Sequence, residues 1–104
     1  MIRHVVLFSF KPDLDPADRE WIIGQVQGIR RIPSVRNFAF GRLLEPAEEW
    51  YKPRMCTDYD LCVTLEFDDE AGLYAYQNDP YHVVVAQEVR KRVTAIKVSD
   101  FVTF

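Results

Sequence analysis

The clearest pattern in this chain is a series of strand-like segments. Residues 59–67 alternate between apolar and polar side chains, which predicts a β-strand with one buried face. Residues 2–10 are β-branched and aromatic, as a strand requires, and residues 35–44 and 96–104 are predicted to be strands as well. The sequence therefore predicts strands at both ends of the chain and in its middle.

Helix start signals lie between these strands. An aspartate followed by a proline occurs at Asp15-Pro16 and again at Asp79-Pro80. Such a carboxylate can accept hydrogen bonds from free backbone N–H groups, and proline fits the first helical turn. Apolar residues then recur at helical spacing. The predicted helices run from Pro16 to Arg31, from Asp68 or Asp69 to Asn78, and from Pro80 to about Thr94.

The order of the predicted elements is β-α-β followed by β-α-α-β. This order predicts a single α+β domain over residues 1–104, of the ferredoxin-like (split βαβ) type, with a four-stranded antiparallel sheet and helices on one face. The first strand is apolar on both faces, with Val6 on one and Val5 and Leu7 on the other. Because the helices cover only one face, we expect a second copy of the chain to cover the other and form a dimeric α+β barrel.

The last predicted helix carries an ionisable ring on its apolar face. His82 lies in the first turn, and Val85, Ala86, Val89 and Val93 follow at spacings that place them on the same helical face. The imidazole is therefore expected to point inward, at the mouth of the space that the helix covers. A histidine in such a place is often a core residue with one hydrogen bond, so a packing role stays open beside a functional one.

Composition limits the partners that this chain can bind. It has 104 residues, of which 48% are hydrophobic and 28% charged, and a formal net charge of −3, which does not suit a nucleic-acid surface. No stretch approaches the ~20 apolar residues of a membrane span, and no signal-peptide pattern follows Met1. We therefore expect a cytoplasmic protein that keeps Cys56 and Cys62 reduced and binds neither nucleic acid nor membrane. No Gly-rich phosphate loop or zinc-ligand spacing indicates a cofactor or a metal.

Residues 45–57 are predicted to form a long loop. This segment holds two prolines, three acids and the pair Trp50-Tyr51, and loops of this length are usually functional or mobile. We expect Trp50 or Tyr51 to anchor the loop on the rim of a pocket or on a partner subunit. Gly41, within the preceding strand, predicts a bulge or a close backbone approach.

Several stretches of the chain, taken together, are similar to one known family. They are Ile2-Arg3-His4-Val5-Val6-Leu7-Phe8, Ile32-Pro33-Ser34-Val35 with Gly41 further on, Tyr76-Gln77-Asn78-Asp79-Pro80-Tyr81-His82-Val83, and Ser99-Asp100-Phe101. The chain resembles the stress-responsive A/B barrel (Dabb) family over nearly its whole length. The resemblance implies a ferredoxin-like protomer that dimerises into an α+β barrel. The chain departs from the family at Asp79, where a histidine is common, and in the length of the loop 45–57.

The best understood members of that family resemble small polyketide cyclases, in which a tyrosine and a histidine act on a poly-β-keto substrate between helices and sheet. By that resemblance Tyr76 and His82 form the catalytic pair. The expected ligand-binding residues come from the first strand, the last helix and the last strand: His4, Val6, Phe8, Val85, Ala86 and Asp100. Each polar member also has a purely structural interpretation, as a packing residue for Tyr76 and His4 or as a solvated strand-end carboxylate for Asp100.

Three function classes fit these residues. The first is a cofactor-free enzyme that transfers protons on a carbonyl compound, such as a cyclase, lyase or isomerase, with His82 as general base and Tyr76 as hydrogen-bond donor. The second is a protein that binds a small molecule without turnover, and the third is a stress-associated structural or assembly homodimer. A filled core beneath His82 would favour the third class, whereas a cavity with converging polar groups favours the first two. His4, His82 and a carboxylate could also bind a metal cation, but the spacing of these residues does not indicate a metal site.

Overall fold

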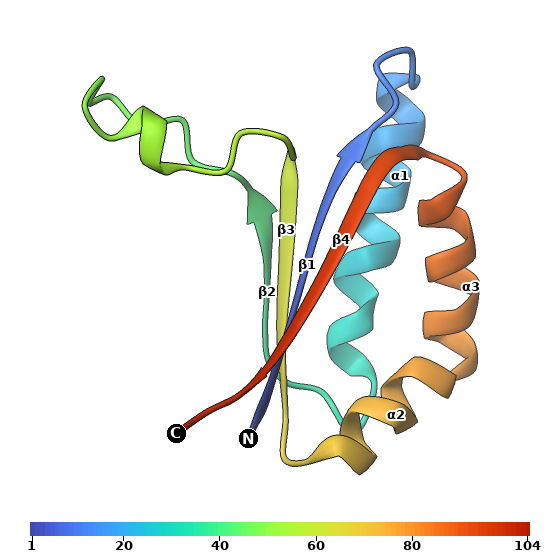
Figure 1. Ribbon diagram of the computed structural model, residues 1–104. Helices are drawn as coiled ribbons and strands as arrows, with labels where there is room; N and C mark the ends of the chain where they lie inside the picture. Colours follow the sequence, from blue (N-terminus) through green and yellow to red (C-terminus); the bar gives the residue numbers. More distant parts are fainter.

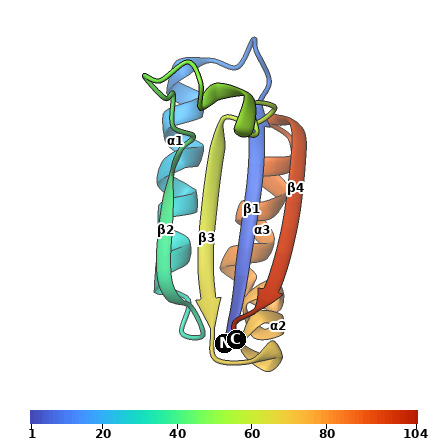
Figure 2. The same cartoon turned by 60° about the vertical axis from the view of Figure 1, so that its left-hand side comes forward.

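The computed structural model describes residues 1–104, which form a four-stranded sheet with three helices on one face (Figure 1). The strands lie in the order β2-β3-β1-β4, and each neighbouring pair is antiparallel (Figure 2). This is the ferredoxin-like α+β fold that the sequence predicts. The elements are β1 (Ile2–Phe10), α1 (Pro16–Gln27), η1 (Gly28–Arg31), β2 (Arg36–Arg42), η2 (Lys52–Arg54), β3 (Leu61–Phe67), α2 (Glu70–Asn78), α3 (Pro80–Arg90) and β4 (Val93–Val102), where η denotes a 3₁₀ helix.

Aspartate caps begin the helices where the sequence predicts them. The carboxylates of Asp15 and Asp79 each accept the backbone N–H two residues further on, at 2.8 and 2.9 Å, and Asp69 caps α2 in a similar way at 2.9 Å. Asp79 also closes α2, because its own N–H donates to the Tyr76 carbonyl at 3.2 Å. One residue therefore joins α2 to α3 and fixes the turn that separates Tyr76 from His82.

Helix α3 is shorter than predicted. It ends at Arg90, and Val93 and Thr94, which the periodicity placed on the helix, begin strand β4 instead. β-Branched side chains lose rotamer freedom in a helix and pack well in a strand, and here they gain the pairing of β4 with β1. Val93 therefore does not share the helical face of His82. Strand β4 ends at Val102, before the predicted end at Phe104.

The irregularity in β2 lies at Asn37 and not at Gly41. The register between β2 and β3 shifts next to Asn37, whose φ of 45° lies in the left-handed region that asparagine tolerates. Gly41 pairs regularly, and nothing lies within 4 Å of the position that a side chain would occupy there. Both expectations for Gly41, the bulge and the close approach, are wrong within the protomer. Strands β2 and β3 are also shorter than the predicted ranges 35–44 and 59–67.

The hydrophobic core lies between the sheet and the helices. Ile22 of α1 and Leu65 and Phe67 of β3 are fully buried at its centre. Side chains of this size each contribute about 1.5–3 kcal/mol through burial. On the opposite, outer face of the sheet, Val5 and Leu7 are only half-buried, and no helix covers them (Figure 1). None of the helices has the length and hydrophobicity needed to cross a membrane.

The segment between β2 and β3, residues 43–60, extends from the sheet as an arm on the side opposite the helices (Figure 1, green). At its tip Trp50 and Tyr51 are 64% and 41% exposed and pack on one another, with ring centroids 5.6 Å apart. Neither ring lines either of the two main pockets of the protomer. The expected anchoring on the pocket rim is therefore wrong for the protomer, and anchoring on a partner subunit stays a prediction.

Candidate functional site

A pocket of about 150 Å³ lies between helix α3 and strands β1 and β4. Its lining is mainly apolar, with polar groups from several elements. The structure brings together all but one of the residues that the sequence predicts for the site: His4, Val6, Phe8, Tyr76, His82, Val85 and Ala86. The space beneath His82 is a pocket and not a filled core. A filled core would have favoured the structural or assembly role.

His82 enters the pocket from the first turn of α3, where the Asp79 cap places it. Its Nδ1 atom lies 3.2 Å from the backbone carbonyl of Gln77. Because a carbonyl only accepts, this bond assigns the proton to Nδ1 and leaves the lone pair of Nε2 free. The imidazole lies against the phenol of Tyr76, with ring centroids 4.1 Å apart. The geometry therefore provides an unpaired basic nitrogen beside a phenol.

The environment of His82 keeps its imidazole neutral. Burial lowers the pKa of His82 below its ordinary value, and the charges of His4 and Arg90 act in the same direction. The Gln77 carbonyl and the Asp79 carboxylate oppose this shift in pKa without reversing it. Desolvation disfavours a charged imidazolium, so His82 is a proton acceptor at neutral pH.

Tyr76 lies at the centre of the polar end of the pocket. It belongs to α2 and is only 2% exposed, and its ring packs against His4 and Phe67 at centroid distances of 5.7 and 5.2 Å. Its hydroxyl makes no hydrogen bond to the protein and is not one of the buried unpaired atoms, so its oxygen is accessible from the pocket. Burial raises the pKa of Tyr76, and the negative charge of Asp100 adds to this rise. The phenol therefore remains protonated and has a free O–H to donate.

The second histidine of the chain, His4, is held by a carboxylate. Strand pairing places His4 of β1 opposite Asp100 of β4, and the His4 Nδ1 atom lies 2.5 Å from the Asp100 Oδ1 atom. His4 is 3% exposed and lines the pocket. Asp100 does not line it, so its predicted role in contacting a ligand is not supported by the geometry. Its carboxylate turns to the buried ring instead and orients it.

Other lining residues were missed by the sequence reasoning. Ile96 and Val98 form the β4 wall of the pocket, and the strand alternation around them was a signal that could have identified them. Gln77 contributes through its backbone, which no side-chain pattern reveals. Arg90 lies in the last turn of the helix, where a cation is common because it interacts favourably with the helix dipole. The sequence therefore gives no sign that Arg90 lines the pocket.

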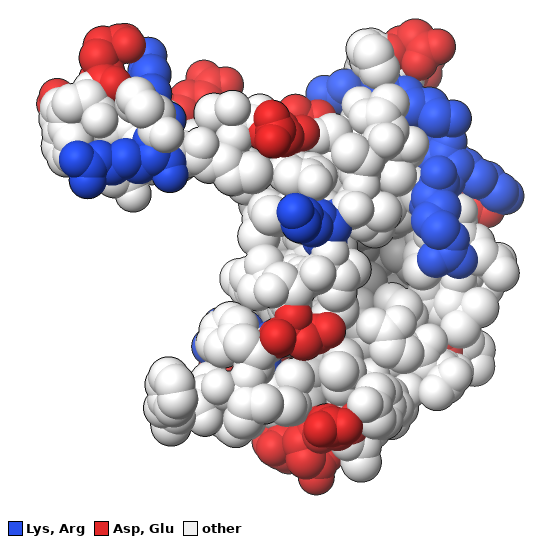
Figure 3. Space-filling view, in the orientation of Figure 1, with Lys and Arg blue, Asp and Glu red and all other residues white.

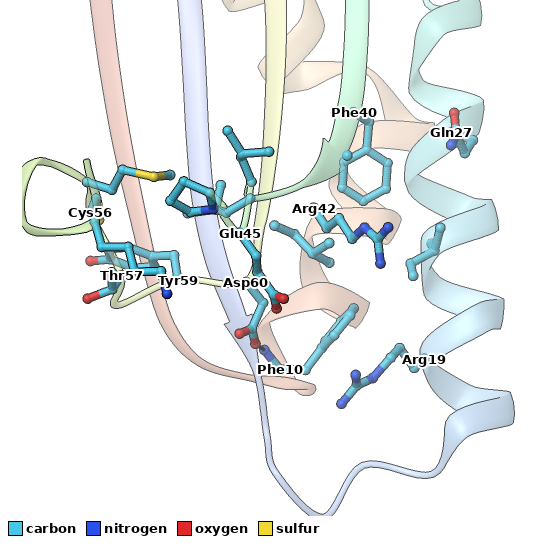
Figure 4. Close-up of a pocket in the computed structure, with 18 residues that line it drawn as sticks. Phe10, Arg19, Gln27, Phe40, Arg42, Glu45, Cys56, Thr57, Tyr59 and Asp60 are labelled. Carbon is cyan, nitrogen blue, oxygen red and sulfur yellow. Dashed lines mark hydrogen bonds between the residues drawn. The ribbon is translucent and has the colours of Figure 1, made fainter. Parts of the chain in front are cut away.

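A larger hollow, of about 1010 Å³, lies at the other end of the sheet, between α1, the ends of β1 and β2, and the arm (Figure 4). Arg19 and Arg42 extend toward it, as the figure shows, and Asp60 uses its carboxylate to accept the Phe10 N–H at 3.2 Å. Neither histidine nor Tyr76 reaches it. We therefore place the candidate site in the smaller pocket, where both histidines and Tyr76 converge. No three His, Cys, Asp or Glu side chains come close enough together to hold a metal ion.

The chain thus forms a small ferredoxin-like α+β domain with a mainly apolar pocket beneath its last helix. The family model of the Stress Responsive A/B Barrel Domain (Dabb) matches residues 2–103. The chain therefore belongs to this family, as its sequence motifs indicate.

Solved structures share this fold over nearly the whole chain. A dimeric ferredoxin-like protein of unknown function from Thermobifida fusca is 27% identical, with a TM-score of 0.79 over 98% of this chain and 90% of that one. A Dabb family protein from Mesorhizobium loti is 24% identical, with a TM-score of 0.77 over 99% and 96% of the two chains. The hydroxynitrile lyase of Passiflora edulis is 20% identical, with a TM-score of 0.84 over 99% and 93%. No curated protein sequence matches the chain.

Proposed function

We propose that this protein is a cofactor-free enzyme that transfers a proton on a small carbonyl compound, as a lyase or an isomerase does. The observation that carries the proposal is the convergence, in one pocket, of a neutral imidazole and a protonated phenol with ring centroids 4.1 Å apart. Both groups have polar atoms that the protein leaves unpaired. Convergent polar groups with shifted pKa values in an apolar pocket are typical of active sites. The Passiflora edulis lyase provides a precedent for catalysis on this fold.

The proposed chemistry uses each group in one step. The Nε2 atom of His82 takes a proton from the carbon next to the substrate carbonyl, and the electron pair of that C–H bond moves to form an enolate. The hydroxyl of Tyr76 donates a hydrogen bond to the enolate oxygen, where the negative charge develops. The imidazolium of His82 then returns the proton to the product. His4, oriented by Asp100, lies against Tyr76 and supports its position.

The pocket volume limits the substrate. A cavity of about 150 Å³ is known to hold one benzene-sized molecule. A poly-β-keto chain with several carbonyl groups, which the family resemblance implies as substrate, is larger than this volume and would extend out of the open pocket. We therefore propose a substrate with one ring or an equally short chain.

The proposed assembly is a homodimer in the cytoplasm, with the outer sheet faces packed together. Val5 and Leu7 are half-buried on that face, and Phe101, which pairs with Arg3 on the same side of the sheet, is 50% exposed. Figure 3 shows that the notch under the arm is lined mostly by uncharged atoms. Related structures are described as dimeric. A stable interface of this kind buries about 1,200–2,000 Å² in total. Light scattering on a sizing column should give twice the mass of the 104-residue chain, and the mass of a single chain would contradict the dimer.

The catalytic proposal is tested by deuterium exchange into phenylacetone, an activated ketone with a single benzene ring. Wild-type protein should accelerate the exchange, and His82→Ala should lower the catalysed rate by about 10²–10⁴-fold. Tyr76→Phe should lower it by about 10²-fold or more, since it removes the donor to the enolate. The matched control is Tyr74→Phe, on the exposed side of the same helix, which should keep the wild-type rate.

The main alternative is that the same pocket binds a small molecule without turnover. Circular dichroism must first show that each variant is folded. Exchange that is equally fast in wild type and folded His82→Ala would remove the catalytic proposal and leave the binding function.

A further inference from the structure

Three cationic residues, Arg90, Lys91 and Arg92, lie at the C-terminal end of helix α3. Only one of them has no ion-pair partner. Lys91 lies 3.1 Å from the Glu88 carboxylate, and Arg92 lies 2.7 Å from Glu88 and 2.8 Å from Asp18. Arg90 takes part in no ion pair or side-chain hydrogen bond, and it lines the pocket. The helix dipole explains positive charge at this end of α3. Arg90 is exposed, and its guanidinium is therefore free to bind a group in the pocket.

Arg90 lies in the same row as the proposed catalytic base. His82, Ala86 and Arg90 follow one another at four-residue intervals and therefore share one face of α3. With a rise of about 1.5 Å per residue, the first and last backbone positions are about 12 Å apart. Helical side chains lean toward the N-terminus, which directs the Arg90 side chain toward Ala86, and both residues line the pocket.

Arg90 is the only Lys, Arg, Asp or Glu residue that lines the pocket. Its opposite wall is formed by the apolar side chains of Ile96 and Val98, which are 47% and 52% exposed, and no Asp or Glu lines the pocket. Figure 3 shows Lys and Arg side chains gathered beside the hollow between β4 and the end of α3. The positive charge of Arg90 is close enough to add to burial in lowering the pKa of His82. The pocket thus has an imidazole and a phenol at one end and a free guanidinium at the other.

We propose that Arg90 binds the carboxylate of the ligand, so that the pocket takes small monocarboxylic acids. Arg90 is exposed, so a ligand can reach its guanidinium from solvent, and a guanidinium matches a carboxylate with two parallel hydrogen bonds. The ligand then lies along the row on α3, with its anionic end at Arg90 and its reactive carbonyl at His82 and Tyr76. The placement of the carbonyl rests on the proposed function, whereas the recognition of the carboxylate does not require turnover.

The proposal is tested with 4-fluorobenzoate and its neutral counterpart 4-fluorobenzamide, which have nearly the same shape. Fluorine NMR titrations give the affinity of each probe for wild type and for three variants. Wild type should bind the benzoate at least about tenfold more tightly than the amide, as expected for hydrogen bonds to a charged group. Arg90→Gln should remove this preference without changing the affinity for the amide, and Arg90→Lys should retain part of it. Lys91→Gln is the matched control, because it removes a neighbouring cation that does not line the pocket, and it should keep the preference.

Three results would overturn the proposal. They are equal affinities of the two probes for wild type, a loss in Lys91→Gln as large as that in Arg90→Gln, and no binding of either probe. The outcome is separable from that of the catalytic proposal, because phenylacetone is uncharged and its exchange does not need Arg90. Exchange that persists without any carboxylate preference removes only the role of Arg90. A carboxylate preference in a protein that catalyses no exchange removes only the catalysis.

Discussion

Replacing Asp100 tests how the buried imidazole of His4 is supported. The His4 Nδ1 atom lies 2.5 Å from a carboxylate oxygen of Asp100, and the Asp100 side chain is 39% exposed. A hydrogen bond to a charged group contributes about 1.5–3 kcal/mol, and exposure to solvent favours the lower end of that range. Asp100→Asn keeps a neutral acceptor worth about 1 kcal/mol, so it should cost only about 0.5–1 kcal/mol. Asp100→Ala leaves a buried N–H unpaired and should cost about 2 kcal/mol.

The assay is urea unfolding followed by tryptophan fluorescence, at one protein concentration for all variants because assembly affects apparent stability. The matched control is Ser99→Ala, which changes the neighbouring residue of β4 on the outer face, opposite Val5, and should change stability by less than about 0.5 kcal/mol. The reasoning fails if Asp100→Ala is as mild as the control. It also fails if Asp100→Asn costs as much as Asp100→Ala, because a neutral acceptor would then be of no use to His4.

Three further predictions follow from other contacts. Burial lowers the pKa of His82 in the folded protein below its ordinary value of 6.5, so as the pH falls the His82 of the unfolded chain is protonated before that of the folded protein. The contribution of His82 to the free energy of unfolding is therefore fully present above about pH 6.5 and is lost as the pH falls below it. In His82→Gln the urea midpoint should depend less on pH over this range, and an unchanged dependence would contradict the assignment. A methyl group on Gly28 would overlap the Tyr81 hydroxyl, which donates to the Gln25 carbonyl at 2.6 Å, so Gly28→Ala should cost about 1 kcal/mol. In a Tyr81→Ala background the same change should be neutral or stabilising, because alanine favours a helix over glycine, and equal effects in both backgrounds would refute the overlap. Amides of residues 45–57 should exchange hydrogen faster than those of β3, and equal protection would show that the arm is held in place.

The sequence predicted most of the fold because its signals are local. Aspartate caps and alternating strands act over a few residues, and the structure has them where these patterns indicate. The error at Val93 and Thr94 has the same origin, since a helical period can be continued by residues that a neighbouring strand holds more strongly. Which of two competing structures forms there depends on pairing with β1, and that pairing is not local.

The candidate site was predicted less completely. His82 could be identified because it follows the Asp79 cap on the apolar face of α3, whereas Tyr76 was identified through the family resemblance. Asp100 was assigned to the right neighbourhood but the wrong contact, because only the register of β4 against β1 shows that it faces His4. The significance of Arg90 lies in the absence of a partner, and a sequence does not show which of several adjacent cations will be paired.

The pH dependence of proton exchange tests the central claim most directly, because it asks whether His82 in its neutral form is the base. We expect the rate of deuterium exchange into phenylacetone to rise with pH through a single ionisation below pH 6.5, where burial places the pKa of His82, and then to stay level at neutral pH. The raised pKa of Tyr76 predicts that no loss of activity from its ionisation appears near pH 10. An ionisation at or above pH 6.5, or one that persists after His82→Ala, would contradict the account.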